Sequence, residues 1–203
     1  MPKVTLEHFA QRKQQILEDC IVCFSRKGFH QTSMRDLCEA LNISAGGLYR
    51  YFGSKEEIIH AMAEEDHAQW LSAFSTLSPD LSFRDSLVAL AAMAKKIYTT
   101  SREINSVWLQ IHAESASNPS VQKLIEQHYR SFSKMLEQVI KRAQARRELT
   151  SHFSAAVLAN FIISAFDGLM MRMVVDSTVS SKKLSRDFVN IITQLTDNRE
   201  DAA

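Results

Sequence analysis

The stretch from Thr32 to Lys55, TSMRDLCEALNISAGGLYRYFGSK, carries side chains that could bind a polyanion. Thr32, Ser33 and Lys55 lie at predicted helix starts, where amides, hydroxyls and a cation together can bind phosphate. The adjoining segment from Arg26 to Arg35 holds three cations and no anion. This pattern predicts contacts with the phosphates of a nucleic acid, although an ordinary solvated surface is the simpler alternative.

Two short helices joined by a tight turn are expected to position these groups. Ser33 and Asp36 have the spacing of a capping box, and Asn42 tolerates the left-handed conformation that ends a helix. Ser44 is placed to cap a second helix, which we expect from Ala45 to Phe52. We therefore predict a helix-turn-helix whose second helix has the size to enter the major groove of DNA.

The outward face of this second helix favours a groove-binding role. Gly46 and Gly47 each cost a helix about 0.5–1 kcal/mol relative to alanine, which packing alone does not demand but close approach to base edges does. A glycine loop between two core helices is the alternative, but it leaves the cluster from Tyr49 to Tyr51 unexplained. Arg35, near the start of the preceding helix, can reach a guanine edge with two hydrogen bonds.

The pattern Thr-Ser-x-Arg-Asp-Leu, a seven-residue gap, Ala-Gly-Gly-Leu-Tyr-Arg-Tyr-Phe and then Ser-Lys-Glu resembles the DNA-binding signature of the tetracycline-repressor-like (TetR) family. The close match covers about Gln14 to Ala61; the rest of the chain resembles the family only in length, helical pattern and helix count. The resemblance implies a transcription regulator in which Gly46 and Gly47 allow close backbone approach, and Tyr49 and Tyr51 hold phosphate or a thymine methyl. Other members carry a larger side chain at the position of Gly47, so base specificity here is expected to depend more on Arg35, Ala45, Tyr49 and Arg50.

Composition indicates an all-α protein of two domains. The 203 residues are 45% hydrophobic and include only five Gly and three Pro, which favours long uninterrupted helices. The net charge is +1, so any basic surface is local. We expect nine helices in a TetR-like fold: a three-helix DNA-binding head over 1–54, an effector-binding and dimerisation body over 55–197, and a disordered tail over 198–203. A helix expected from Lys55 to about Phe74 starts in the head and ends in the body, so it could act as a lever.

Three cysteines, an odd number, and the lack of an apolar leader predict a location in the reducing cytoplasm. Cys20 and Cys23 have the spacing of a metal or redox pair, but no second pair accompanies them, and small packing residues are the interpretation we favour. The most apolar stretch, Ala155 to Val175, is interrupted by three polar residues. It predicts a buried or interface helix and no membrane span.

The last two helices are expected to form a homodimer. A helix that is apolar on two sides must bury both, and a reader of a palindrome needs a twofold partner to place two recognition helices at a fixed spacing. The resemblance implies a four-helix bundle of the last two helices of each subunit; a monomer with a thick core is the alternative. The candidate interface residues are Phe161, Ala165, Leu184, Phe188, Ile192 and Leu195.

The body offers a binding cavity and no catalytic constellation. The sequence contains no Ser-His-Asp pattern with an elbow glycine, no phosphate loop and no HExxH, so we expect neither an enzyme nor a cofactor. A metal site of histidines is conceivable, but nothing in the sequence brings them together. A largely apolar cavity with a few polar anchors suits a bulky organic effector, and the resemblance implies such an inducer. The candidate effector-binding residues are Trp108, Ile111, His112, His128, Phe132, Phe166 and Met170.

Together these features predict a homodimeric repressor that binds a palindromic double-stranded DNA operator and is released by a small organic effector. An activator or global regulator without an inducer is the alternative within the same class. An enzyme or carrier that uses a helical body is the alternative from another class, and the signature from Thr32 to Lys55 argues against it.

Overall fold

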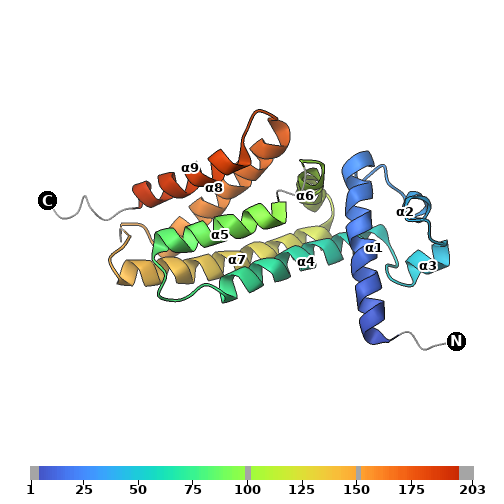
Figure 1. The fold of residues 1–203 in the computed structure, drawn as a ribbon, viewed down its shortest axis with the longest axis horizontal. Helices are drawn as coiled ribbons and strands as arrows, with labels where there is room; N and C mark the ends of the chain where they lie inside the picture. The colour runs from blue at the N-terminus through green and yellow to red at the C-terminus, as the bar shows by residue number, and fades with distance from the viewer. Residues whose placement is uncertain (1–4, 99–101, 150–151, 197–203) are drawn as a thin grey trace. The chain divides into compact units, whose positions relative to one another are not determined.

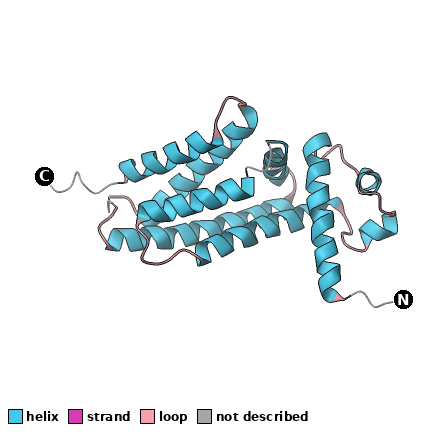
Figure 2. Ribbon diagram, viewed as in Figure 1, coloured by secondary structure: helices cyan, strands magenta, loops and turns pink. Residues whose placement is uncertain are grey.

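The computed structural model describes residues 5–98, 102–149 and 152–196, so the predicted tail over 198–203 lies outside the described residues. Within these ranges the chain folds into nine α-helices and contains no β-strand (Figure 1 and Figure 2), which confirms the predicted class. The helices are α1 (Leu6–Lys27), α2 (Met34–Ala40), α3 (Ala45–Tyr49), α4 (Lys55–Ser75), α5 (Phe83–Tyr98), α6 (Arg102–Ser115), α7 (Pro119–Ala145), α8 (Ala155–Val175) and α9 (Ser181–Leu195).

The predicted caps define the ends of α2 and α3. Ser33 Oγ accepts a hydrogen bond from Asp36 N at 3.2 Å, and Ser33 N donates to Asp36 Oδ2 at 2.7 Å, which completes the capping box. Asn42 has a φ of 50°, the left-handed conformation expected at the end of α2. α3 ends at Tyr49 and not at Phe52 as predicted, because the next residues continue as a turn in which Phe52 N donates to Leu48 O at 3.0 Å.

The chain packs as two compact units that are not continuous in sequence. The first comprises Met1–Glu65 and Glu103–Ile125, and the second comprises Asp66–Arg102 and Glu126–Ala203. The division between these units falls inside α4 and places α6 in the first unit, while the functional boundary at residue 54 stays a prediction. A module of three helices is too small to bury a sufficient core alone. The first part of α4 and α6 supply further apolar side chains, which are less than 3% exposed: Ile58, Ile59, Met62, Val107 and Ile111.

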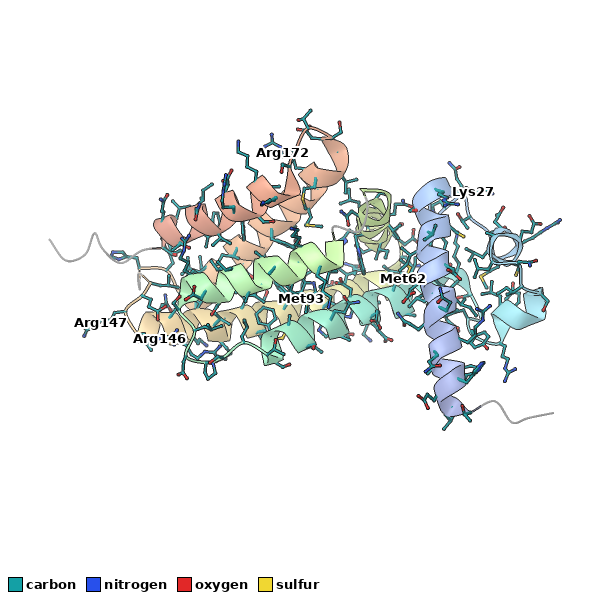
Figure 3. The ribbon with its side chains drawn as sticks, in the orientation of Figure 1. Lys27, Met62, Met93, Arg146, Arg147 and Arg172 are labelled. Atoms are coloured by element: carbon teal, nitrogen blue, oxygen red, sulfur yellow. The ribbon has the colours of Figure 1, made fainter. Side chains whose placement is uncertain are left out.

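The second unit is a helical bundle in which α9 packs on α5 and α8. Arg84 Nη2 of α5 donates to Asn190 Oδ1 of α9 at 2.9 Å. The loop that leads into α5 is held by Arg146, which donates to Pro79 O at 2.8 Å and to Leu81 O at 2.6 Å. Its neighbour Arg147 is exposed and has a φ of 59°, a left-handed conformation that is unfavourable for a residue with a side chain. Arg146 therefore stabilises this part of the fold, whereas Arg147 holds a strained backbone (Figure 3).

Replacing these arginines by glycine should therefore change stability in opposite directions. Arg147→Gly relieves a left-handed conformation that costs an L-residue roughly 1–2 kcal/mol, partly offset by the greater freedom of the unfolded chain, and should raise the melting temperature slightly. Arg146→Gly removes charge-assisted hydrogen bonds worth about 1–3 kcal/mol and should lower it. Thermal unfolding followed by circular dichroism measures both, and Arg147→Ala is the control that should gain nothing. A loss of stability in Arg147→Gly would contradict the strain at this position.

Candidate functional site

Arg35 projects into solvent near the start of α2. Its side chain is 89% exposed, and Arg35 Nε pairs with Glu39 Oε1 at 3.0 Å along the same helix. An exposed pair of this kind contributes only about 0.3–0.5 kcal/mol, so the guanidinium can leave Glu39 for a base edge at little cost.

The two glycines of α3 differ in their surroundings. A Cβ added at Gly46 would have no atom within 4 Å, whereas one added at Gly47 would lie 3.1 Å from Ser44 Oγ. Ser44 Oγ accepts the hydrogen bond from Gly47 N at 3.1 Å, so a side chain at Gly47 would crowd the cap of α3. Gly46 opens the outer face to a close partner, whereas a side chain at Gly47 would need the Ser44 hydroxyl to shift by a few tenths of an ångström.

The outer face of α3 presents one aromatic and one cationic side chain next to Gly46. Tyr49 is 52% exposed, and Arg50 is exposed at the C-terminal end of the helix. Arg50 Cζ lies 5.7 Å from the ring centroid of Phe9 on α1, and the ring of Tyr51 stacks on Phe9 at 4.7 Å. The apolar spacing of α1 predicts that Phe9 packs on the helix-turn-helix, but it does not reveal the contacts with Arg50 and Tyr51, which lie more than forty residues further along the chain.

Two other predicted DNA-binding residues face the interior. Thr32 is 1% exposed, and its Oγ1 donates to Gly28 O at 2.7 Å. Lys55 Nζ donates to Phe29 O at 2.8 Å and lies 4.3 Å from the centroid of the Phe29 ring. Both side chains hold the turn between α1 and α2, where Gly28 has a φ of 86°. The DNA interface that we propose below therefore leaves Thr32 and Lys55 out.

The N-terminus of α2 carries a carboxylate that is neutralised locally. Lys27 Nζ lies 2.5 Å from Asp36 Oδ1. The hydrogen bond from Lys27, followed by those from Ser33, lowers the pKa of Asp36 well below its ordinary value. Asp36 is therefore charged at neutral pH, and its Lys27 partner offsets the repulsion that this charge would exert on a phosphate.

The second unit contains a cavity between α4, α5, α7, α8 and α9. Its empty volume is about 640 Å³, a figure that includes the solvent in its open mouth. Of the predicted effector-binding residues, Phe132, Phe166 and Met170 line it. The full lining is Trp70, Leu87, Leu90, Ala91, Ala94, Phe132, Leu136, Ile162, Ile163, Phe166, Leu169, Met170, Met173, Leu184, Ser185 and Phe188.

The other predicted effector-binding residues lie elsewhere. Trp108, Ile111 and His112 belong to α6 in the first unit, where Ile111 is 1% exposed in the core. His128 is in the second unit, but its ring stacks on that of His67 at 4.3 Å and it is not part of the lining. Their role in effector binding stays a prediction.

Trp70 of α4 lines the cavity, but the sequence did not predict it as an effector-binding residue. Its ring lies edge-to-face with Phe132 at 5.0 Å and with Phe166 at 6.0 Å. The apolar pattern of α4 places Trp70 in a core, but it does not reveal that α7 and α8 bring further aromatic rings to it.

The predicted dimer residues divide between two faces. Phe161 and Leu195 are 53% and 63% exposed, and Val157 and Ile191 beside them are 55% and 54% exposed. Ile192 is 3% exposed, while Leu184 and Phe188 line the cavity, so these three side chains serve the interior of their own unit. Ala165 is half-buried.

By length and composition α8 could cross a membrane, with a mean hydropathy of 1.5, and 22% of it is buried in the single chain.

Possible metal ligands are scattered in the part of the chain that the structure describes, and one cysteine is buried in the core. No group of three His, Cys, Asp or Glu side chains there could hold a metal ion. Cys20 is buried, and this burial raises the pKa of its thiol to about 12. Cys20 is therefore a neutral packing residue, as favoured from the sequence.

A capped helix-turn-helix in one unit and a helical bundle with an apolar cavity in the other define a DNA-binding transcription regulator. The chain belongs to the tetR family of bacterial regulatory proteins: that family's model matches residues 16–62, and the model for the C-terminal part of BetI-type transcriptional repressors matches residues 84–195.

Individual proteins support the same assignment. The transcriptional regulator UidR of Escherichia coli K12 is 24% identical over 159 residues, which are 78% of this chain and 79% of UidR. GusR of Salmonella enterica superposes with a TM-score of 0.76 at 24% identity and covers 96% of this chain and 98% of its own. A putative transcriptional regulator from Saccharomonospora viridis, solved with choline, superposes with a TM-score of 0.78 at 21% identity, covering 93% and 98%.

Arg35→Ala should reduce operator affinity by about 1–3 kcal/mol and relax the preference at one base pair in each half-site. Binding to a random duplex should hardly change, because a contact to a base edge carries sequence information that a phosphate contact lacks. Affinities for both duplexes over a salt series measure the difference. Lys134→Ala, which removes an exposed cation from α7 in the second unit, is the matched control. An equal loss on both duplexes would show that Arg35 contacts phosphate only.

Proposed function

We propose that this protein is a homodimeric repressor in which each subunit places α3 in the major groove of one half of a palindromic operator. The exposed face of α3 carries the proposal. Gly46 leaves the backbone open, Tyr49 and Arg50 project beside it, and Arg35 projects from α2. Ser33 and Ser44, just before these helices, are further predicted phosphate contacts.

A dimer through α8 and α9 is supported by their exposed apolar faces. Phe161 and Val157 on α8, with Ile191 and Leu195 on α9, are each more than half exposed in the single chain. Large apolar side chains gathered on neighbouring helices indicate an interface, and the low burial of so apolar a helix as α8 has the same explanation. The twofold axis of such a dimer matches the symmetry of a palindromic operator.

Release by an effector is supported by the path of α4. This helix contributes Ile58 and Ile59 to the core of the first unit, and further along it contributes Trp70 to the cavity wall of the second. A ligand that displaces Trp70 acts on the same continuous helix that supports the DNA-binding head. A preference of the ligand for the state that cannot bind DNA, with about 1–3 kcal/mol of coupling, lowers operator affinity roughly 5- to 150-fold.

The assembly is tested by Phe161→Asp. A carboxylate at the centre of the proposed interface would be buried without a partner in the dimer but solvated in the monomer. We expect monomers with unchanged helical content, and a loss of affinity for a two-half-site operator that greatly exceeds the loss for a single half-site. Sedimentation, circular dichroism and binding to the two duplexes measure these effects.

Val88→Asp is the matched control, because Val88 is a 48% exposed apolar side chain on α5, outside the proposed interface. It should leave the dimer and operator binding unchanged. A Phe161→Asp variant that remains a dimer would exclude this interface.

A further inference from the structure

The cavity of the second unit lacks the groups that would receive a charged ligand. Among the described residues that line it, the polar groups are the Ser185 hydroxyl and the Trp70 indole N–H, and none of these side chains is charged. Building on the proposed function, we propose that the effector is an uncharged, hydrocarbon-rich molecule with at most one neutral hydroxyl-type group, held near Ser185.

Two polar pairs on the surrounding helices are hydrogen-bonded to each other and lie outside the cavity lining. Tyr129 Oη donates to Asp167 Oδ2 at 2.7 Å, and Ser133 Oγ donates to Asn160 Oδ1 at 3.3 Å. Neither pair belongs to the cavity lining. The carboxylate of Asp167, the nearest acidic candidate in α8, is therefore committed to Tyr129 and does not serve as a counter-ion for a ligand.

An ionic head group would also lack compensation from the aromatic rings. Burial of an unpaired charge in apolar surroundings is strongly disfavoured. A quaternary ammonium group can be held by the open faces of aromatic rings. Here the aromatic rings pack edge-to-face against one another instead: the plane of Trp70 lies at 88° to that of Phe132 and at 86° to that of Phe166. Phe166 in turn meets Phe188 with planes at 62°. This arrangement favours aliphatic or aromatic hydrocarbon over a cation such as choline.

The test compares three ligands with one tail: 1-octanol, octanoate and octyltrimethylammonium, with choline as a fourth probe. The chain has two tryptophans, so in Trp108→Phe the fluorescence reports on Trp70 alone. We expect octanol to change this fluorescence at a concentration at least tenfold lower than either ionic analogue, and choline to have no effect. Equal or tighter binding of an ionic analogue or of choline would overturn the inference.

A negative charge placed in the cavity should reverse the order of the ligand affinities. Ser185→Asp should raise the affinity for octyltrimethylammonium relative to octanol at least tenfold, whereas Ser72→Asp, at an exposed position of α4 outside the lining, should not. An unchanged ratio in Ser185→Asp would overturn the placement of the polar end. If none of the probes affects Trp70 while the protein still binds its operator, both the inference and the cavity as effector site fail, and the DNA-binding function stands.

A second, independent observation concerns Phe9 of α1. Its ring contacts two consecutive residues at the end of α3, the guanidinium of Arg50 at 5.7 Å and the ring of Tyr51 at 4.7 Å with planes at 25°. A guanidinium held over a ring loses less freedom when it binds phosphate than a free one does. We infer that Phe9 is a positioning residue, which holds Arg50 and Tyr51 ready for the DNA backbone.

Substitutions that keep or remove the ring test this role. Phe9→Leu should lower operator affinity and reduce the slope of log affinity against log salt by about one, as expected for one lost phosphate contact, while Phe9→Tyr should stay within twofold of the unmodified protein. Phe9→Leu added to Arg50→Ala should cause no further change in slope. A purely structural role for Phe9 predicts the opposite: a lower melting temperature with an unchanged slope, or a further fall in slope when Arg50 is already absent.

Discussion

DNA recognition by this protein depends on a helix that cannot fold alone. α3 has five residues, whereas isolated helices shorter than about 12–15 residues are marginal in water. It is held by the burial of Leu48 and Phe52, which are 0% and 1% exposed, and by the Ser44 cap on the amide of Gly47. The side chains that we propose to read DNA are therefore positioned by the apolar core beneath them.

The same shortage of core explains why the DNA-binding unit recruits segments from further along the chain. Phe29 N donates to Gln110 Oε1 of α6 at 2.6 Å, and Phe29 O accepts from Lys55 of α4 at 2.8 Å. The backbone N–H and C=O of Phe29 are thus both hydrogen-bonded to side chains from distant parts of the sequence, as buried backbone groups require. Lys55, which the sequence suggests as a phosphate ligand, therefore helps to stabilise the DNA-binding unit.

The second unit separates two apolar surfaces that share the same helices. α8 gives Ile162, Phe166 and Met170 to the cavity and Phe161 to the exposed face. Because neither surface carries a charge at these positions, the free energy of binding at each comes mainly from the removal of apolar area from water. A ligand in the cavity and a partner on the outer face, as proposed, would act on opposite sides of one helix, and this would link effector binding to assembly.

The sequence by itself determined what depends on neighbours a few residues apart. The Ser33–Asp36 capping box, the left-handed Asn42, the Ser44 cap and the succession of nine helices follow from local hydrogen bonds and apolar periodicity, and all of them are present in the described part of the chain. The family and the class of function followed from the same stretch, because its signature lies within consecutive residues.

Only the tertiary structure decided which face of each helix meets which partner. Ile192 and Leu195 belong to one apolar stripe of α9, yet they are 3% and 63% exposed. Phe9 of α1 meets the ring of Tyr51, which follows α3, and Trp70 of α4 meets the ring of Phe132 of α7. Periodicity states that a helix has an apolar face, but the depth to which each residue is buried depends on helices that the chain brings back from far along its length.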